Sequence, residues 1–172
     1  EYWTGVGGCD GGTGPIEIHF IDEVNPGYFW IFPVSENVVN VGVGMVISEQ
    51  RKQKGMRSSL KKMQKWITSE SPRFSHRFKN AQMVEGTGKG WQLPFGSPRM
   101  KPASFQPRRG AMAGAMCVGD SASLVDPFTG EGIGNALVSA KLTAKIFDRE
   151  KHANGFPADQ AAHYMELSLI HI

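Results

Sequence analysis

Residues 118–137 read VGDSASLVDPFTGEGIGNAL and combine three signals in a fixed order. The uncharged stretch 111–118 leads into Asp120, a loop follows with glycines at three alternate positions, and helical spacing of apolar residues begins after it. This order predicts a strand, a ligand-binding loop and a helix N-terminus. In an α/β protein such a segment holds an anionic or electron-rich cofactor, because the first N–H groups of the helix have no partner within it.

Each residue type in the loop has a chemical reason to take part in binding. The carboxylate of Asp120, displayed after the strand, can accept hydrogen bonds from the hydroxyl groups of a sugar-type ligand. Glycines 130, 132 and 134 let a flat ligand approach the backbone. The simpler interpretation is a glycine-rich loop that only turns the chain, but Asp120 upstream and Pro127 within the loop favour a cofactor site. The predicted helix has one apolar face, made of Ile133, Ala136, Leu137, Ala140, Ala144 and Phe147.

An aromatic strand precedes this segment. Residues 28–33 read YFWIFP, and after eight residues the chain reads Gly-Val-Gly. In a strand, alternate side chains share a face, and residues 34–37 are short enough for a hairpin loop. If the aromatic face and the glycine face lie on the same side of the sheet, they form a slot between rings and bare backbone. Such a slot would suit a long apolar chain. The plainer alternative is an aromatic core cluster. The residues of the slot are Tyr28, Trp30, Phe32, Gly42 and Gly44.

The first motif, GDSA-(x)4-P-(x)2-GEGI, resembles the second FAD motif of the flavoproteins that include p-hydroxybenzoate hydroxylase and the geranylgeranyl reductases. The resemblance implies FAD as cofactor, with Asp120 on the ribityl chain and the backbone of Gly132 and Ile133 against the flavin ring. Pro127, Gly130 and Glu131 would lie nearby. Ser121 stands where alanine is usual in this motif.

The second motif, Y-x-W-x-F-P followed by G-x-G, resembles the signature of the geranylgeranyl reductases, and residues 1–6 and 90–94 resemble flanking stretches. The resemblance implies reduction of C=C bonds in an isoprenoid or prenyl-lipid substrate by hydride from reduced FAD. The electron donor would be NAD(P)H or a ferredoxin-like protein. Two alternatives stay open, because the FAD motif is shared: a flavin-dependent monooxygenase or halogenase, and a fragment without catalysis of its own. No side chain stands out as a catalytic acid.

The predicted fold is α+β with an α/β part. Residues 1–108 would form an antiparallel substrate-binding sheet with helices, and residues 109–166 the C-terminal strand-loop-helix part of a Rossmann-like FAD-binding domain. No G-x-G-x-x-G follows a strand, so we expect the ADP-binding segment to be missing from this piece. Residues 167–172 read like a translated adapter sequence, which predicts a non-native tail. Strands are expected at 16–20, with one buried face, and at 38–47, a return to the sheet within 81–95, and helices at 56–67 and 157–166.

Composition excludes several other classes of protein. A net charge of +3 over 172 residues gives no reason to expect a nucleic-acid partner. No His, Cys or carboxylate group has metal-ligand spacing, two cysteines make no disulfide framework, and no apolar run is long enough to span a membrane. These features fit a cytoplasmic protein. The helix at 56–67 carries a basic face, which is either a solvated surface or a peripheral contact with anionic lipid headgroups; its residues are Lys52, Lys54, Arg57, Lys61, Lys62 and Lys65.

Overall fold

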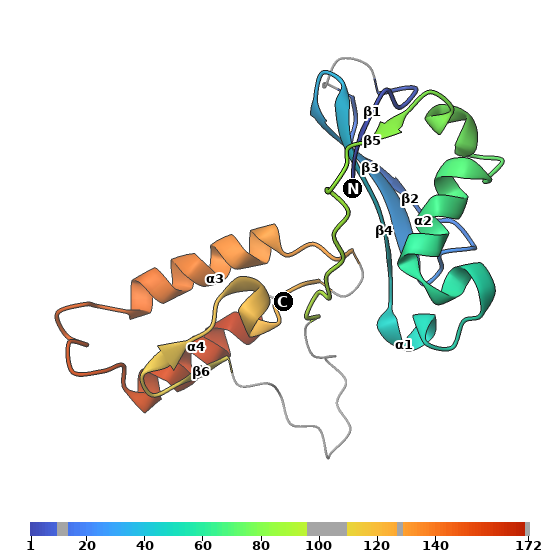
Figure 1. The fold of residues 1–172 in the computed structure, drawn as a ribbon. Helices are drawn as coiled ribbons and strands as arrows, with labels where there is room; N and C mark the ends of the chain where they lie inside the picture. Colours follow the sequence, from blue (N-terminus) through green and yellow to red (C-terminus); the bar gives the residue numbers. More distant parts are fainter. Residues whose placement is uncertain (10–13, 96–109, 127–128, 171–172) are drawn as a thin grey trace. The chain divides into compact units, whose positions relative to one another are not determined.

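The computed structural model describes residues 1–9, 14–95, 110–126 and 129–170 (Figure 1). The chain divides into two compact units, Glu1–Gly90 and Trp91–Ile172. The fold is mixed α/β, with a five-stranded antiparallel sheet in the first unit. The boundary predicted at residue 108 falls within 96–109, outside the described residues, so it stays a prediction.

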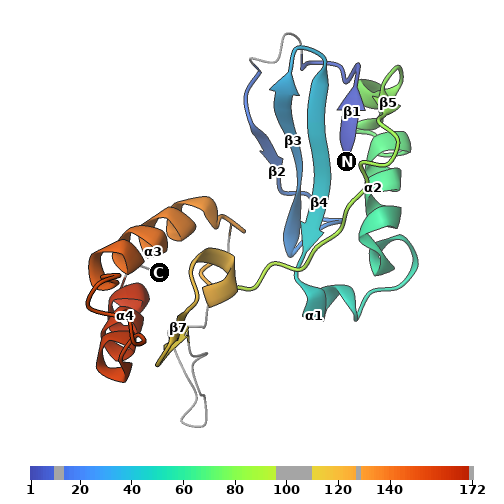
Figure 2. The ribbon, with the colours of Figure 1, turned by 60° about the vertical axis from the view of Figure 1, so that its left-hand side comes forward.

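The sheet of the first unit has the strand order β2-β3-β4-β1-β5 (Figure 2). Its strands are β1 (Tyr2–Thr4), β2 (Glu17–His19), β3 (Gly27–Ser35), β4 (Val38–Met45) and β5 (Gln82–Met83). β3 and β4 form the long central hairpin. Its connection is only residues 36 and 37, because β3 continues past Pro33 with a shift of register before Ser35. The expected return of residues 81–95 to the sheet is limited to β5.

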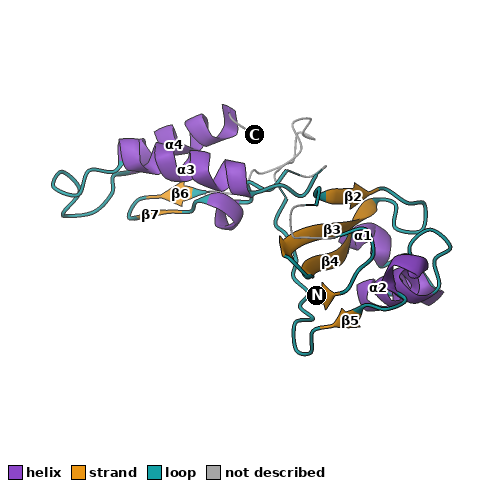
Figure 3. Cartoon of the chain, turned by 90° about the horizontal axis from the view of Figure 1, so that it is seen from above, coloured by secondary structure: helices purple, strands orange, loops and turns teal. Residues whose placement is uncertain are grey.

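Helix α2 (Leu60–Ser69) covers one face of this sheet (Figure 3). Its side chains Met63 and Ile67 are fully buried in a core with alternate residues of the central hairpin, namely Phe29, Ile31, Val39, Val41 and Val43. The helix predicted at 56–67 begins later than expected, because Ser59 is extended. Three short helices complete the unit: α1 (Ile47–Gln50), η2 (Gly55–Ser58) and η3 (Ser75–Phe78).

The prediction for residues 16–20 is right in its strand and wrong in its buried face. Ile18 is 46% exposed and Phe20 62%, whereas Glu17 and His19 point inward and are largely buried. The reason is Arg77 of η3, whose Nη1 and Nη2 donate to the two oxygens of Glu17, both at 2.7 Å. A buried carboxylate needs such a partner, and here the pairing decides which face of β2 turns inward.

The second unit begins its described part with a small hairpin, β6 (Ala111–Met112) and β7 (Ala115–Met116). The continuous strand predicted over 111–118 is therefore wrong. The chain reverses at Gly114, whose φ of +83° is a conformation that glycine adopts easily. A short parallel bridge joins Phe95 to Val125. The core of the unit contains Ala111, Phe156, Ala161 and Tyr164.

Helix α3 (Ile133–Ile146) begins directly after Gly132, as predicted, but its predicted apolar face is not buried in this structure. Ile133 is 78% exposed and Leu137 68%. The side that packs on α4 (Ala158–Ile170) and the hairpin instead uses Leu142 and Ile146, with Ser139 fully buried. The last helix includes residues 167–170 of the suspected tail, and residues 171–172 lie outside the described part. Among the described helices, none is long and apolar enough to cross a membrane.

The ion pair between Glu17 and Arg77 gives a prediction for stability. Arg77→Met leaves a largely buried carboxylate without its partner and should lower the free energy of unfolding by about 3 kcal/mol at neutral pH. The hydrogen bonds from Arg77 hold the pKa of Glu17 below its ordinary 4.5. The stabilisation is therefore complete above that pH and is lost as the pH falls through the lowered pKa, so the variant and the wild type should converge in acid.

Urea unfolding followed by tryptophan fluorescence measures this effect, because three of the four tryptophans lie in the first unit. Lys79→Met, which removes an exposed cation two residues away, is the matched control and should leave stability unchanged. Equal losses for Arg77→Met and Lys79→Met would show that the ion pair does not stabilise the unit.

Candidate functional site

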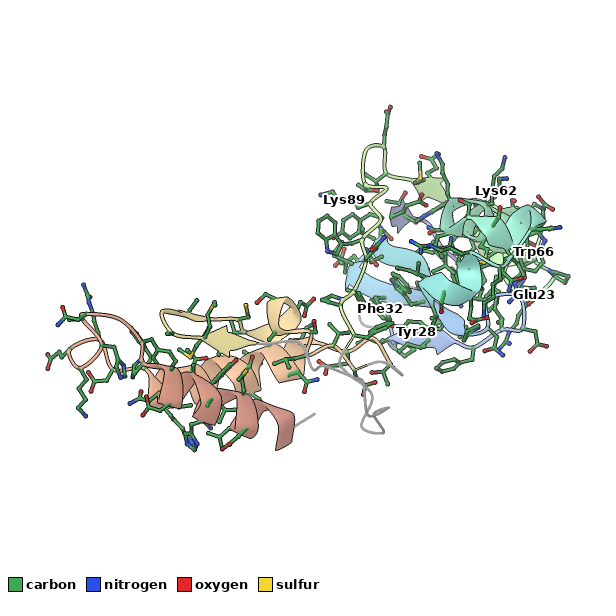
Figure 4. All side chains as sticks on the ribbon, turned by 90° about the horizontal axis from the view of Figure 1, so that it is seen from below. Glu23, Tyr28, Phe32, Lys62, Trp66 and Lys89 are labelled. Atoms are coloured by element: carbon green, nitrogen blue, oxygen red, sulfur yellow. The ribbon has the colours of Figure 1, made fainter. Side chains whose placement is uncertain are left out.

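The outer face of the first sheet, opposite α2, carries a continuous row of four aromatic rings that we call the aromatic face: Phe20, Tyr28, Trp30 and Phe32. Neighbouring ring centroids are 5.9, 5.9 and 6.0 Å apart along the row. Figure 4 shows Tyr28 and Phe32 on one side of the sheet and Lys62 and Trp66 on the helix at the other side. Burial raises the pKa of the Tyr28 hydroxyl, so this group is protonated at neutral pH.

The glycines of β4 lie directly opposite these rings. In the hairpin register Tyr28 pairs with Gly44 and Trp30 with Gly42. A Cβ atom added at Gly42 would fall inside the indole of Trp30, whereas one added at Gly44 would lie 3.7 Å from the ring, an ordinary contact. The two predicted faces therefore coincide, but the floor at Gly42 is not open. The indole itself fills that space.

Asn40 fixes the orientation of the indole. The Nε1–H of Trp30 donates to Oδ1 of Asn40 at 2.8 Å. Strand alternation places Asn40 on the same face of β4 as Gly42 and Gly44. The sequence contains one indication of its role, because Asn40 is the single polar side chain in the apolar strand 38–45. Held by Gly42 beneath and Asn40 at its edge, Trp30 has one defined position.

Exposed aliphatic residues extend the aromatic face. Ile18 of β2 is directly opposite Trp30, and Ile16 and Val34 are 71% and 56% exposed. This surface is larger than sequence analysis indicated, because β2 was expected to bury its apolar side chains. A face that combines stacked rings and aliphatic groups can bind a long apolar ligand by burial of its surface.

The second candidate site is the loop before α3. Asp120 was predicted to follow a strand directly. It lies instead in the short helix η4 (Gly119–Ala122), where it is exposed. A Cβ atom at Gly132 would lie 2.9 Å from Oδ1 of Asp120 and 3.3 Å from Val125. Asp120 and Gly132 are thus neighbours. Their role in binding a cofactor stays a prediction.

The other predicted loop residues have structural tasks of their own. Gly130 has a φ of +73°, and its N–H donates to the carbonyl of Asp126 at 2.9 Å. Oε1 of Glu131 accepts a hydrogen bond from the N–H of Gly134 at 2.6 Å and so caps α3. This carboxylate lies at the positive end of the helix, where a cofactor is also predicted to bind. Ile133 is exposed at the first helical position, and Pro127 lies outside the described residues.

Ser139 supports the loop from below. Its hydroxyl accepts the N–H of Gly119 at 2.9 Å and donates to the carbonyl of Ala136, while Asn135 donates to the carbonyl of Leu124 at 2.6 Å. These contacts tie η4 to α3 and keep Asp120 beside Gly132. In the described part of the chain, no group of three or more His, Cys, Asp or Glu residues could hold a metal ion.

Residues 10–88, which contain the aromatic strand and both glycines opposite it, match the geranylgeranyl reductase catalytic domain. The chain is a distant homologue of reductases of this family. It is 29% identical over 151 residues to the digeranylgeranylglycerophospholipid reductase of Thermoplasma acidophilum. The aligned residues make up 86% of this chain and 33% of that protein. It is 30% identical over 158 residues to a menaquinone reductase of Mycobacterium tuberculosis, covering 88% and 34%.

A solved structure of the family has the same fold as this chain. The crystal structure of a geranylgeranyl bacteriochlorophyll reductase-like protein from Thermoplasma acidophilum superimposes with a TM-score of 0.64 at 26% identity, over 96% of this chain and 36% of that chain. The chain therefore spans about a third of the length of the reductases that it matches. The match to the catalytic domain includes the aromatic face and ends before the Asp120 loop.

The contact between Gly42 and Trp30 predicts a coupling that can be measured. Gly42→Ala must push the indole off the sheet and should lower the free energy of unfolding by about 1–3 kcal/mol. In a Trp30→Ala background the same change should cost far less, because the two residues share one space. Gly44→Ala is the matched control, and its cost should not depend on Trp30. Urea unfolding of the double-mutant cycle decides this, and strict additivity for Gly42 and Trp30 would refute the contact.

The proximity of Asp120 and Gly132 predicts the behaviour of a flavin ligand. In an FAD-loaded protein that contains this chain, Asp120→Ala should weaken FAD binding by about 1–3 kcal/mol, since hydroxyl partners are left unpaired. Asp159→Ala removes an exposed carboxylate from α4 and serves as control. Flavin content after gel filtration, with binding measured by fluorescence titration, gives the result. Normal FAD affinity in Asp120→Ala would remove this residue from the cofactor site.

Proposed function

We propose that this chain forms the substrate-binding sheet and part of the flavin site of an FAD-dependent reductase that saturates C=C bonds of an isoprenoid chain. The observation that carries this proposal is the aromatic face, four rings in an unbroken row on the side of the sheet opposite α2. The residues of the row fall in the segment that matches the geranylgeranyl reductase catalytic domain.

The chemistry of the aromatic face fits the substrate class. An isoprenoid chain has methyl branches and double bonds but no hydrogen-bonding group, so its recognition rests on apolar contact. The face offers such contact without a charged side chain. Its polar atoms are the Tyr28 hydroxyl, which stays neutral, and the indole N–H of Trp30, which is already paired with Asn40. The similar reductases named for a glycerophospholipid and for menaquinone differ in head group, so the prenyl chain is the common element for this face to recognise.

The Asp120 loop fits FAD on the chemistry of its donors and acceptors. The exposed carboxylate of Asp120 can accept hydrogen bonds from ribityl hydroxyls. The missing side chain at Gly132 lets the carboxylate of Asp120 and the side chain of Val125 come close to the backbone of the loop. When bound, reduced FAD supplies the hydride for the double bond. The residues of this chain bind and orient the two reactants, while NAD(P)H or a ferredoxin-like protein would supply the electrons.

Binding of the prenyl chain tests this function with the chain as it is. Geranylgeraniol in a mild detergent should quench tryptophan fluorescence and bind more tightly than the shorter geraniol. Trp30→Ala should weaken binding of geranylgeraniol roughly tenfold, through loss of a large apolar contact. Trp91→Ala, which removes an 89% exposed indole in the second unit, is the control. Equal binding of both alcohols, or equal affinity in Trp30→Ala, would count against a prenyl site on this face.

The reaction itself is tested in an FAD-loaded protein that contains this chain. After anaerobic photoreduction, addition of a geranylgeranyl lipid should reoxidise the flavin and yield a saturated chain by mass spectrometry. Reoxidation by oxygen alone, with an oxygenated product and no saturation, would identify a monooxygenase instead. The prenyl-binding titration and this reaction are independent readouts. Failure of the titration would contradict the prenyl site, and failure of the reaction alone would contradict the reductase chemistry.

A further inference from the structure

Charge is segregated along the first unit of the chain. Residues 1–50 contain seven acidic residues and no lysine or arginine. Residues 51–69 contain seven lysines and arginines and no acidic residue. The modest net charge of +3 conceals this arrangement, because the two blocks cancel. The second block builds η2 and α2, so these cations are concentrated on the helical layer of the unit.

Two cations of the second block have a polar partner, and the other five have no carboxylate nearby in the described part of the chain. Lys52 forms an ion pair with Glu49 at 2.7 Å, and Arg57 donates to the carbonyl of Asn25 at 2.6 Å. Within the described part of the chain, no carboxylate lies within ion-pair distance of the five others, all of which are exposed. These five define the basic surface: Arg51, Lys54, Lys61, Lys62 and Lys65.

The geometry of α2 keeps the basic surface on the outside of the molecule. Lys61, Lys62 and Lys65 follow the spacing of one helical face, and Met63 and Ile67 lie on the opposite face in the core. Figure 4 shows Lys62 projecting from α2 away from the sheet. Met63 and Ile67 are fully buried, so the apolar face of α2 is turned to the sheet. The helix therefore presents mainly its charged face to a partner.

We propose that the basic surface binds the anionic headgroups of a lipid membrane, and that the association is electrostatic and peripheral. Lysines on flexible stems suit a diffuse array of charges rather than a single shaped ligand, because an ammonium lacks the fixed fork of a guanidinium. A planar anionic surface can contact several of these exposed cations at once, and salt screens the attraction beyond about 8–10 Å.

The placement of the lysines disfavours a nucleic acid as partner. Proteins that hold single strands stack exposed aromatic rings against bases, and the aromatic face lies on the opposite side of the sheet from the lysines. The lipid proposal requires no catalysis and is independent of the proposed reductase function.

Vesicle flotation with the full 172-residue chain tests this proposal. Phosphatidylcholine vesicles containing phosphatidylglycerol should bind the chain at low salt, release it at high salt, and outcompete vesicles of phosphatidylcholine alone. Each lysine near an anionic surface contributes about fivefold to partitioning, so replacing Lys61, Lys62 and Lys65 together by glutamine should weaken binding about 100-fold. These lysines are exposed, and circular dichroism should show an unchanged fold.

The matched control removes the same charge elsewhere. Glutamine in place of Lys141, Lys145 and Lys151, all exposed in the second unit, should leave vesicle binding within a few-fold of the wild type. Equal loss in both triple variants would show a response to net charge alone and would overturn the proposal. The proposal also fails if anionic vesicles do not bind the wild type, or if the α2 variant keeps its affinity. A single-stranded RNA bound through the same three lysines, without vesicle binding, would assign the surface to nucleic acid instead.

Discussion

The ion pair between Glu17 and Arg77 is the constraint on which the first unit depends. Alternate residues of a strand face opposite sides, so turning Glu17 and His19 inward to meet Arg77 turns Ile18 outward and places Phe20 beside Tyr28. The same guanidinium donates to the carbonyl of Gly7 and contacts the sulfur of Cys9. One cation from η3 thereby fixes the edge of the sheet and supplies the aromatic face with its outermost ring.

The sequence predicted the parts of the fold that rest on strong local periodicity. The central hairpin, its alternating faces and the start of α3 after Gly132 followed from spacing and glycine placement. The orientation of β2 did not follow, since an alternating apolar pattern looks the same whether it faces the core or a ligand. Only Arg77, sixty residues away in the chain, reverses that interpretation. The prediction of one continuous strand at 111–118 was wrong for a similar reason, because an uncharged stretch with one glycine fits both a strand and a tight hairpin.

The two candidate sites illustrate what motifs can and cannot specify. Spacing alone placed Trp30 opposite Gly42 and suggested an open floor, but the space above the glycine belongs to the indole. Glu131 accepts a hydrogen bond from the N–H of Gly134 at the start of α3, and its place beside a cofactor stays a prediction. In both cases the residue types indicated a close contact, but they did not show which group makes it. A missing side chain indicates that something approaches closely, without stating whether it is a ligand or a neighbouring residue.

The fixed position of Trp30 has a consequence for the thermodynamics of binding. An indole resting on Gly42 and hydrogen-bonded to Asn40 has already lost its rotamer freedom on folding. A ligand that lies against it does not have to immobilise it again, so the entropic penalty of association falls mainly on the ligand. A flexible apolar chain loses many torsional degrees of freedom when it is bound extended. A rigid aromatic wall is therefore the arrangement that leaves most of the contact energy available for affinity.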